Sequence, residues 1–236
     1  MLTQSCYNYG SKRKGGSSVT IEKLFDLSHT LAKDYLAAFT YPYEALSGIK
    51  KMIASLGATL SADEYDEVKE HVWVAKTADV APTAYLGEYT IVGPETEVRH
   101  CAFVRGAALI GAGCVVGNST EIKNAIIFDG VQIPHYNYVG DSILGYRSHM
   151  GAGSIASNFR SDKGNIVLHT PDGDMETGLR KIGTMLGDFV EVGCNSVLCP
   201  GSIVGRNSIV YPLSRVRGVI PENSIFKDAE HIVPKK

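Results

Sequence analysis

The chain has 236 residues and a formal net charge of −2, which allows one large domain or two small ones with an ample core. The near balance of charge excludes a basic face for nucleic acid or an anionic membrane surface, so we expect neither as a partner. Five cysteines at irregular spacings favour reduced thiols in a cytoplasmic protein over a disulfide framework. No apolar run approaches the length of a membrane span.

The first part of the chain lacks the repeat that dominates the rest. Residues 1–17 are polar, basic and contain several Gly and Ser, and we expect them to be mobile. Over residues 19–39 apolar side chains recur at helical spacings, which predicts a helix. A second short helix is expected over residues 45–56, followed by a charged turn. We therefore predict that residues 1–70 form a flexible N-terminus and a helical accessory region for packing or oligomerisation.

From residue 74 an aliphatic side chain recurs every six residues, often followed by Gly or Ala. The first series contains two single-residue slips, and a second series begins after residue 183. Such internal repetition outranks local propensity as a guide to the fold. The members of the two series are Val74, Val80, Leu86, Val92, Val98, Val104, Ile110, Val116, Ile122, Ile127, Ile133, Val139, Leu144 and Met150, then Leu186, Val192, Leu198, Val204, Val210 and Val216.

A period of six fits neither an amphipathic helix nor an alternating strand. It fits a prism in which each short strand points one aliphatic side chain inward and each corner needs a small residue. Three such faces make a coil of about eighteen residues, and the coils stack at a strand spacing of about 4.8 Å. The fold class predicted for residues 71–236 is therefore mainly β, a parallel β-helix of hexapeptide repeats. The repeat is lost over about 154–182, which predicts an inserted loop, functional or decorative.

Arg105 and Lys123 each follow an aliphatic member of the repeat and are one coil apart. Stacked coils would hold these two cations about 5 Å apart on one edge. Cations held so close repel each other, and a phosphate between them would offset this cost. The alternative is that both are solvated surface charges, each near a Glu or Asp. The residues alone leave the two interpretations equal.

His135 lies in the polar stretch QIPHYNYVGD, which interrupts the aliphatic repeat. Tyr138 follows closely, and Asp141 is near enough in sequence to orient the imidazole ring. A neutral imidazole near pH 7 suits the removal of a proton from an attacking amine. The alternative is a structural histidine hydrogen-bonded at a corner. The cation pair one face away favours a catalytic base.

Other chemistries find little support in the sequence. A β-helix zinc enzyme needs converging histidines, two of them closely spaced. The candidates have no such spacing, so we predict no metal: His100, His135, His149 and His169. Nucleophile-elbow, Walker and Rossmann signatures are also missing from the sequence.

Five segments resemble one known family. They are VRG (104–106), EIKNA (121–125), PHYNYVGDS (134–142), GAGSIASNF (151–159) and GDFVEVGCNSVL (187–198). Their text is similar to the C-terminal acetyltransferase domain of the bacterial bifunctional N-acetylglucosamine-1-phosphate uridyltransferase/glucosamine-1-phosphate acetyltransferase and its archaeal counterparts. The string His-x-x-Tyr-x-Gly-Asp, followed by Gly-Ala-Gly and Asn, is far more specific than the hexapeptide repeat. The resemblance implies a left-handed β-helix.

The resemblance also implies roles for individual residues. His135 matches the general base of the family, and Arg105 and Lys123 match residues that contact the sugar phosphate. Four further positions lie where the family contacts substrate or coenzyme. Tyr138 and, with a one-residue offset, Lys163 match substrate contacts; Asn158 matches a residue that places the acetyl-CoA thioester, and Cys194 stands where the family has a coenzyme-contacting serine.

Two further positions depart from the family pattern. His149 replaces an asparagine of the sugar pocket, and Phe159 replaces a tyrosine beside the acetyl group. The loop over residues 160–182 is also longer than that of the family. These changes keep the base and the phosphate contacts but leave the identity of the sugar open.

The activity that the resemblance implies is acetyl-CoA-dependent N-acetylation of an amino-sugar 1-phosphate in nucleotide-sugar or cell-envelope precursor synthesis. Backbone N–H groups near residues 151–153, or Asn158, would hold the developing oxyanion. Residues 1–70 are too short for the family's nucleotidyltransferase domain, so we expect no uridyl transfer by this chain. Because the family uses clefts between prisms, the resemblance implies a homotrimer with composite sites.

Two alternatives remain open. The first is a non-catalytic subunit that binds a sugar phosphate or sugar nucleotide, and the second is a trimerisation module for a separate nucleotidyltransferase chain. The enzyme is favoured over both because the phosphate contacts, the base and the Asn are all retained. Failure to bind acetyl-CoA would favour the first, and co-purification of a nucleotidyltransferase would favour the second.

Overall fold

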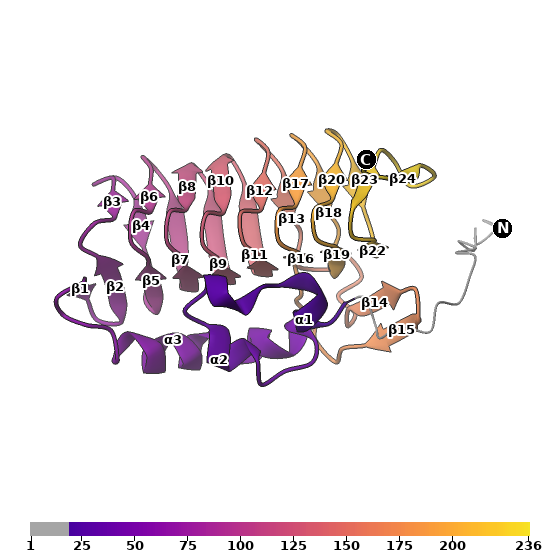
Figure 1. Ribbon diagram of the computed structural model, residues 1–236. Coiled ribbons are helices and arrows are strands. Elements are labelled where there is room, and N and C mark those ends of the chain that lie inside the picture. The colour runs from indigo at the N-terminus through magenta and orange to yellow at the C-terminus, as the bar shows by residue number, and fades with distance from the viewer. Residues whose placement is uncertain (1–18) are drawn as a thin grey trace.

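The structure, a computed structural model, describes residues 19–236. The stretch over residues 1–17 that the sequence predicts to be mobile lies outside the described residues. The fold is a left-handed parallel β-helix of about 9 turns with a short helical region along one side (Figure 1). The predicted fold class is confirmed.

The prism has three faces. The first face is a nine-stranded sheet made of β3 (Asp79–Val80), β6 (Glu97–Val98), β8 (Val115–Asn118), β10 (Gln132–His135), β12 (His149–Met150), β17 (Glu191–Val192), β20 (Ile209–Val210), β23 (Ser224–Phe226) and the antiparallel β24 (Ile232–Pro234). The second face contains β4 (Tyr85–Leu86), the first halves of β7 (Phe103–Ile110), β9 (Glu121–Ile127) and β11 (Tyr138–Leu144), then β13 (Ile155–Ala156), β18 (Val197–Leu198) and β21 (Arg215–Val216).

The third face takes the second halves of β7, β9 and β11, because these long strands bend around a corner. Its other strands are β2 (Val72–Ala75), β5 (Thr90–Val92), β16 (Thr184–Leu186), β19 (Ser202–Val204) and β22 (Val219–Ile220). We call the edge between the first and second faces the first corner, and the edge between the second and third faces the second corner.

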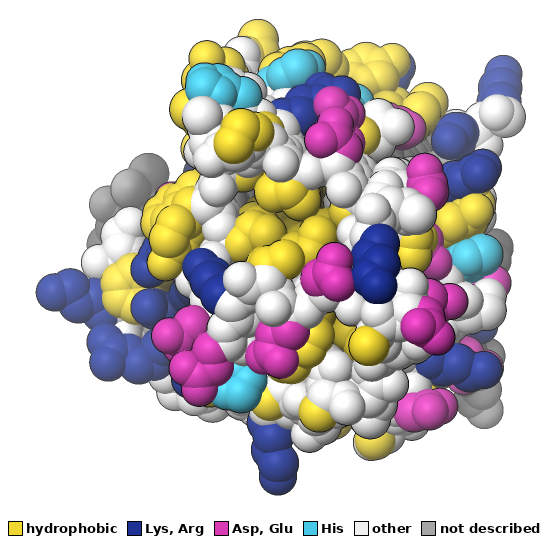
Figure 2. Space-filling model, turned by 90° about the vertical axis from the view of Figure 1, so that its left-hand side faces the viewer, with side chains coloured by type: hydrophobic (Ala, Val, Ile, Leu, Met, Phe, Trp, Pro, Cys, Tyr) yellow, Lys and Arg dark blue, Asp and Glu magenta, His cyan; other side chains and the backbone are white. Residues whose placement is uncertain are grey.

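The strand register explains the slips in the repeat. Val98 pairs with Val116, a full repeat of eighteen residues, whereas Val116 pairs with Ile133, one residue fewer. The inward aliphatic side chains of these coils are buried and form one continuous core. Val74 and Val80 are only half-buried because they belong to the end coil. Figure 2 views this end, where hydrophobic side chains gather at the centre among charged ones.

Buried Ser and Thr side chains line the inside of the corners, a feature that the aliphatic repeat does not reveal. Thr96 Oγ1 donates to the carbonyl of Gly111 at 2.6 Å, and Ser208 Oγ donates to the carbonyl of Pro221 at 2.7 Å. Corner carbonyls lie outside the strand ladders and would otherwise be buried without a partner. These hydroxyls therefore tie successive coils together where the sheet cannot.

The N-terminal region differs in detail from the prediction. The single helix expected over residues 19–39 is wrong, because the chain forms three short pieces: α1 (Ile21–Leu24), η1 (Leu27–His29) and α2 (Lys33–Leu36). Asp26 Oδ1 accepts a hydrogen bond from Ser28 N at 3.0 Å, and Thr30 is extended, so helical hydrogen bonding stops at both places. The second expected helix corresponds to η2 (Pro42–Gly48) and α3 (Ile49–Gly57). The charged turn is instead β1 (Tyr65–Lys69), antiparallel to β2.

The helical pieces pack along the third face, with α3 against β5, β7 and β9. Asp188, 2% exposed, fixes the start of this region to the prism: its carboxylate accepts from Asp26 N at 2.7 Å and from Tyr146 N at 2.9 Å. Burial raises the pKa of Asp188 above its ordinary value, against the effect of these hydrogen bonds. The accessory region is therefore part of the folded unit.

The inserted segment leaves the prism after β13 and returns at β16. It carries an antiparallel hairpin of β14 (Val167–Thr170) and β15 (Gly173–Glu176), which extends on the same side as the helices (Figure 1). His169 Nε2 lies 3.1 Å from Arg217 Nη2, so the hairpin rests against a later coil. The segment that the sequence predicts to be an inserted loop therefore contains an antiparallel hairpin.

Candidate active site

The second corner carries a polar cluster drawn from three successive coils. Its centre is Asp141, a residue with a positive φ whose side chain is 8% exposed. Lys123 Nζ lies 3.2 Å from Asp141 Oδ2, and Asn158 Nδ2 donates to the same oxygen. Asn124 Nδ2 donates to Asp141 Oδ1 at 2.8 Å. One carboxylate therefore holds a lysine and two amides at this corner.

The structure corrects two interpretations of these residues. Lys123 pairs in the sheet with Gly106, because the strand register shifts at Arg105. Arg105 Nη1 lies 2.8 Å from Glu121 Oε1, so Arg105 and Lys123 each have a carboxylate partner. The carboxylate partners agree with the alternative in which each cation lies near a Glu or Asp, but only Arg105 is a solvated surface charge, because the Lys123 side chain is 19% exposed. Asp141 does not orient His135: it binds the second-corner cluster, and within residues 19–236 the His135 ring makes no hydrogen bond.

Tyr138 points outward from the second face and adjoins the cluster. It pairs in the sheet with Glu121 and Ile155 on the neighbouring coils. Burial raises the pKa of Tyr138 above its ordinary value, the charges of Asp141 and Glu121 raise it further, and a hydrogen bond with Asn158 opposes the shift. The phenol is therefore a neutral hydrogen-bonding group near pH 7.

His135 and Cys194 both lie on the first corner, away from this cluster. Gly153 N donates to the carbonyl of His135 at 2.9 Å, and Asn195 N donates to the carbonyl of Ala152 at 2.8 Å. His135 and Cys194 are both exposed. Two coil steps, about 10 Å along the prism, separate them.

Several of the proposed oxyanion donors already make hydrogen bonds. Gly151 N donates to the carbonyl of Val192 at 2.7 Å, and Gly153 N is used in the bond to His135. Asn158 Nδ2 is bound to Asp141. The oxyanion contact expected near residues 151–153, or at Asn158, stays a prediction: Gly151 N and Gly153 N belong to the hydrogen bonds between coils, whereas Ala152 N makes no hydrogen bond among residues 19–236.

His149 points outward from the first face. Its Nδ1 lies 2.8 Å from Glu191 Oε2 on the next coil. Both side chains line a cavity of about 700 Å³ that Gln132, Tyr146 and Arg147 also line. The structure therefore places His149 on a different face from Tyr138, although both are predicted to contact the substrate.

The remaining predicted residues lie in the inserted segment. Lys163 is exposed, with a positive φ, in a turn beside the Arg160–Asp162 ion pair. The hydrogen bond from Arg160 lowers the pKa of Asp162 to about 2. Phe159 is 39% exposed and pairs with Lys181 in an isolated bridge.

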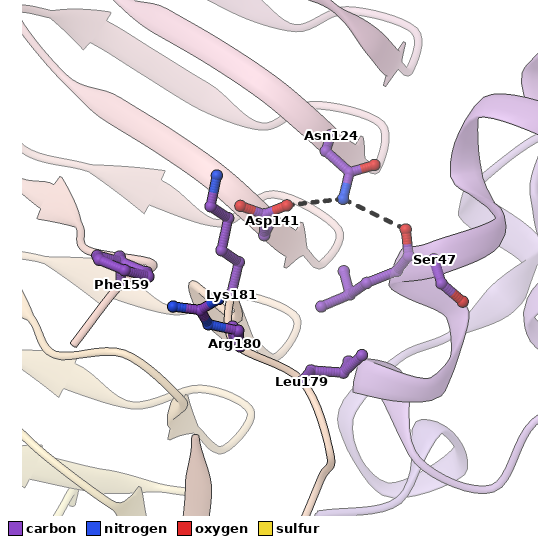
Figure 3. Close-up of a pocket in the computed structure, with 8 residues that line it drawn as sticks. Ser47, Asn124, Asp141, Phe159, Leu179, Arg180 and Lys181 are labelled. Carbon is purple, nitrogen blue, oxygen red and sulfur yellow. Dashed lines mark hydrogen bonds between the residues drawn. The ribbon is translucent and has the colours of Figure 1, made fainter. Parts of the chain in front are cut away.

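Phe159 lines a second cavity, of about 500 Å³, beside the second corner (Figure 3). The other residues that line it are Leu46, Ser47, Asn124, Asp141, Leu179, Arg180 and Lys181. Sequence reasoning missed Asn124, Arg180 and Lys181 as site residues. Asn124 stands inside the quoted EIKNA segment, whereas the Arg-Lys pair stands in a loop without a repeat, where nothing indicates its position in space.

Residues 95–225 match the family described as the GMPPB C-terminal domain, which is more than half of the chain. The chain belongs to this family. The matched region begins before the first predicted site residue of the prism and ends after the last, so all the candidate residues of the β-helix lie inside the GMPPB C-terminal domain match.

Curated relatives share part of the same region. The chain is 33% identical over 113 residues to the bifunctional protein GlmU of Methanococcus maripaludis, which covers 48% of this chain and 27% of that protein. It is 31% identical over 103 residues to the bifunctional sugar-1-phosphate nucleotidylyltransferase/acetyltransferase of Sulfurisphaera tokodaii, covering 44% of this chain and 26% of that protein. The chain thus spans about a quarter of the length of these two relatives.

Among solved structures, the acetyltransferase domain of PglB from Neisseria gonorrhoeae in complex with acetyl coenzyme A is similar at 16% identity with a TM-score of 0.33. The match covers 79% of this chain and 67% of that one. Within residues 19–236, no helix is long and apolar enough to cross a membrane, and no cluster of three potential metal ligands occurs.

Proposed function

We propose that the chain is an acetyl-CoA-dependent N-acetyltransferase that acts on an amino-sugar 1-phosphate for nucleotide-sugar or cell-envelope precursor synthesis. The observation that carries the proposal is the second-corner cluster, in which Lys123, Tyr138 and Asn158 surround Asp141 within the matched family region. The names of the curated relatives, which join sugar-1-phosphate and acetyltransferase activities, support the substrate class.

In the proposed reaction the amine of the sugar attacks the thioester carbonyl of acetyl-CoA. A new C–N bond forms, the C–S bond breaks, and CoA leaves as the thiol. His135 removes the proton of the attacking amine and supplies one to the departing sulfur. Binding both substrates in one geometry provides much of the rate enhancement, so no acyl-enzyme is needed.

A single chain does not complete this site. His149 points out of the first face, His135 lies on the first corner, and Arg105 and Lys123 lie on the second corner. These residues face different directions, so a neighbouring copy must bring one group to the other. We therefore propose a homotrimer with sites between prisms.

The second face supports this assembly. Outward hydrophobic side chains on this face form two pairs on neighbouring coils, Tyr85 with Phe103 and Ile155 with Val197, and remain between 38% and 54% exposed. Glu121 and Tyr138 lie between the two pairs. Exposed apolar side chains that gather on one face commonly mark interfaces between proteins.

The test replaces His135. His135→Ala is expected to lower kcat/KM for acetyl transfer by about 10²–10⁴-fold, measured by thiol release with a panel of hexosamine 1-phosphates. His231→Ala is the matched control, because His231 is an exposed histidine near the C-terminus paired with Asp228, and its rate should not change. A near wild-type rate for His135→Ala contradicts the assignment of the base.

The ion pairs of Arg105 and Lys123 favour a second candidate, a non-catalytic subunit that binds a sugar phosphate or supports a nucleotidyltransferase. Both cations already have carboxylate partners in the absence of ligand. Binding of a hexosamine 1-phosphate without thiol release across the panel would support this candidate over the enzyme.

A further inference from the structure

The first face carries a histidine and a carboxylate that are held together on its outer surface. Gln132, His149 and Glu191 pair in the sheet on successive coils, so their side chains form an outward ladder. His149 Nδ1 lies 2.8 Å from Glu191 Oε2. An ionised carboxylate only accepts hydrogen bonds, so Nδ1 carries the proton and Nε2 of the neutral ring is an acceptor. Among residues 19–236, Nε2 makes no hydrogen bond.

This pair lies beside space for a ligand, unlike the other pairs of its kind. His169 with Asp174 and His231 with Asp228 also have an imidazole within hydrogen-bond distance of a carboxylate. Neither of those pairs lines one of the two cavities described above, whereas His149 and Glu191 both line the cavity of about 700 Å³. A base that is itself oriented by a third group is the usual arrangement in proton-transfer sites.

The wall of this cavity is supported by the accessory region. The Tyr146 ring stacks on His29, with centroids 3.6 Å apart, and Asp129 N donates to the carbonyl of His29 at 3.1 Å. Burial raises the pKa of Asp129 above its ordinary value. Carboxylates outnumber cations in the cavity, which favours a positively charged ligand. The charged side chains that line it are Glu95, Asp129, Arg147 and Glu191.

The proposed acetyl transfer leaves one proton without an acceptor. An alkyl amine is mainly an ammonium ion near pH 7, and an ammonium nitrogen has no electron pair with which to attack a carbonyl. The amide keeps one of the three ammonium protons, so two protons leave the nitrogen. His135 passes one to the departing sulfur, and the other must reach solvent through a second base.

We propose that His149, oriented by Glu191, takes this first proton from the ammonium group of the amino-sugar phosphate. An N–H bond of the ammonium breaks, its electron pair stays on the nitrogen, and an N–H bond forms at His149 Nε2. The Glu191 carboxylate stabilises the imidazolium. The two side chains are 35% and 53% exposed, so the proton passes on to water. The inference rests on the proposed function, and the asparagine that the family has at this position could not accept a proton.

The test is the pH dependence of kcat/KM for thiol release with glucosamine 1-phosphate and the other hexosamine 1-phosphates of the panel. His149→Asn keeps a hydrogen-bonding side chain but removes the base. As the pH rises, more of the substrate arrives as the free amine and needs no second base. We therefore expect a loss of about tenfold at pH 7 and of less than about twofold at pH 9. A loss by the same factor at every pH would show a structural or binding role and overturn the inference.

Glu191 is tested as a positioning residue. Glu191→Ala should show a smaller loss with the same pH trend, and Glu191→Gln, which keeps an acceptor for the Nδ1 proton, should recover most of the rate. Glu97→Ala is the matched control, because Glu97 lies on the same outward ladder three coils away, is paired with Arg99 and does not line the cavity. Its rate should be unchanged at every pH.

The outcomes separate this inference from the proposed function. Wild-type transfer together with a ratio of wild-type to His149→Asn rates that does not change with pH overturns the inference alone. No thiol release by the wild type at any pH, with any member of the panel, overturns both. In contrast to His149→Asn, His135→Ala is expected to be impaired at pH 7 and at pH 9 alike, because the second proton leaves only after the amine has attacked.

Discussion

Asp141 and Cys114 show how single buried groups decide local chemistry. The Asp141 carboxylate organises the second corner because three side-chain nitrogens from the two neighbouring coils reach it. Cys114 is 1% exposed, and its Sγ donates to the carbonyl of Phe128 at 3.1 Å. Burial raises the pKa of the Cys114 thiol to about 12. The first group holds the side chains of one corner together, and the second is an inert thiol.

The thiols are therefore expected to differ in reactivity. At pH 8 only about one Cys114 in ten thousand would be a thiolate, so an alkylating reagent should leave it unmodified in the native protein. Cys101 and Cys194 are exposed and should react. Peptide mapping by mass spectrometry after labelling, with and without denaturant, checks this. Rapid labelling of native Cys114 would contradict the buried position, and protection of Cys194 but not Cys101 by acetyl-CoA would support a coenzyme contact.

At the scale of the elements, the distance between coils limits which residues the corners accept. A Cβ added to Gly117 would lie 1.5 Å from the carbonyl oxygen of Pro134 on the next coil. That oxygen belongs to backbone held by the sheet, so it cannot move aside. Gly117 does not have a positive φ, so its backbone conformation does not require glycine. The requirement for a small residue at this position comes from the close approach of the neighbouring backbone.

Gly117→Ala is therefore expected to lower the free energy of unfolding by about 3 kcal/mol or more, as overpacking of a rigid site does. Gly164→Ala is the matched control. Its added Cβ would have its nearest neighbour at 3.5 Å, in an exposed turn of the inserted segment, so the change should stay within about 0.5 kcal/mol. Urea denaturation followed by circular dichroism measures both. Equal midpoints for the two variants would refute the steric argument.

For the whole molecule, the arrangement of faces bears on assembly. The third face is covered by the helical region, and the hairpin extends on the same side, whereas the second face exposes two pairs of hydrophobic side chains. Leu213, on the first corner beside that face, is 80% exposed and has a positive φ of 61°. An exposed leucine in this conformation is costly, and a neighbouring copy that covers it would offset the cost.

Ile155→Asp and Val197→Asp are each expected to convert the proposed trimer to monomer, because an uncovered charge would lie in an apolar interface. Light scattering after size-exclusion chromatography gives the mass. Val68→Asp is the control: Val68 is 58% exposed on β1, away from the second face, and this variant should keep the wild-type mass. Retention of the trimer by both second-face variants would exclude this face as the interface.

The extent of the prediction differs between fold and site. Each six-residue repeat states locally which side chain must be buried, so the sequence determined the β-helix and its one-residue slips, such as that between Val116 and Ile133. It did not reveal the broken helices before residue 40, because short pieces there are held by the prism through contacts such as Asp26 with Asp188. The spacing of apolar residues within a segment does not show which distant residues that segment will contact.

By itself, the sequence determined the prism and the identity of the polar residues on it, because the six-residue period shows which side chains are buried in the core. Only the tertiary structure decided that Arg105 and Lys123 are already paired and that Arg180 and Lys181 are not. A charge acquires its partner from the neighbouring coil or from a segment far away in sequence. The cavity itself exists because residues 46–47 and 179–181, separated by most of the β-helix, meet at the same corner.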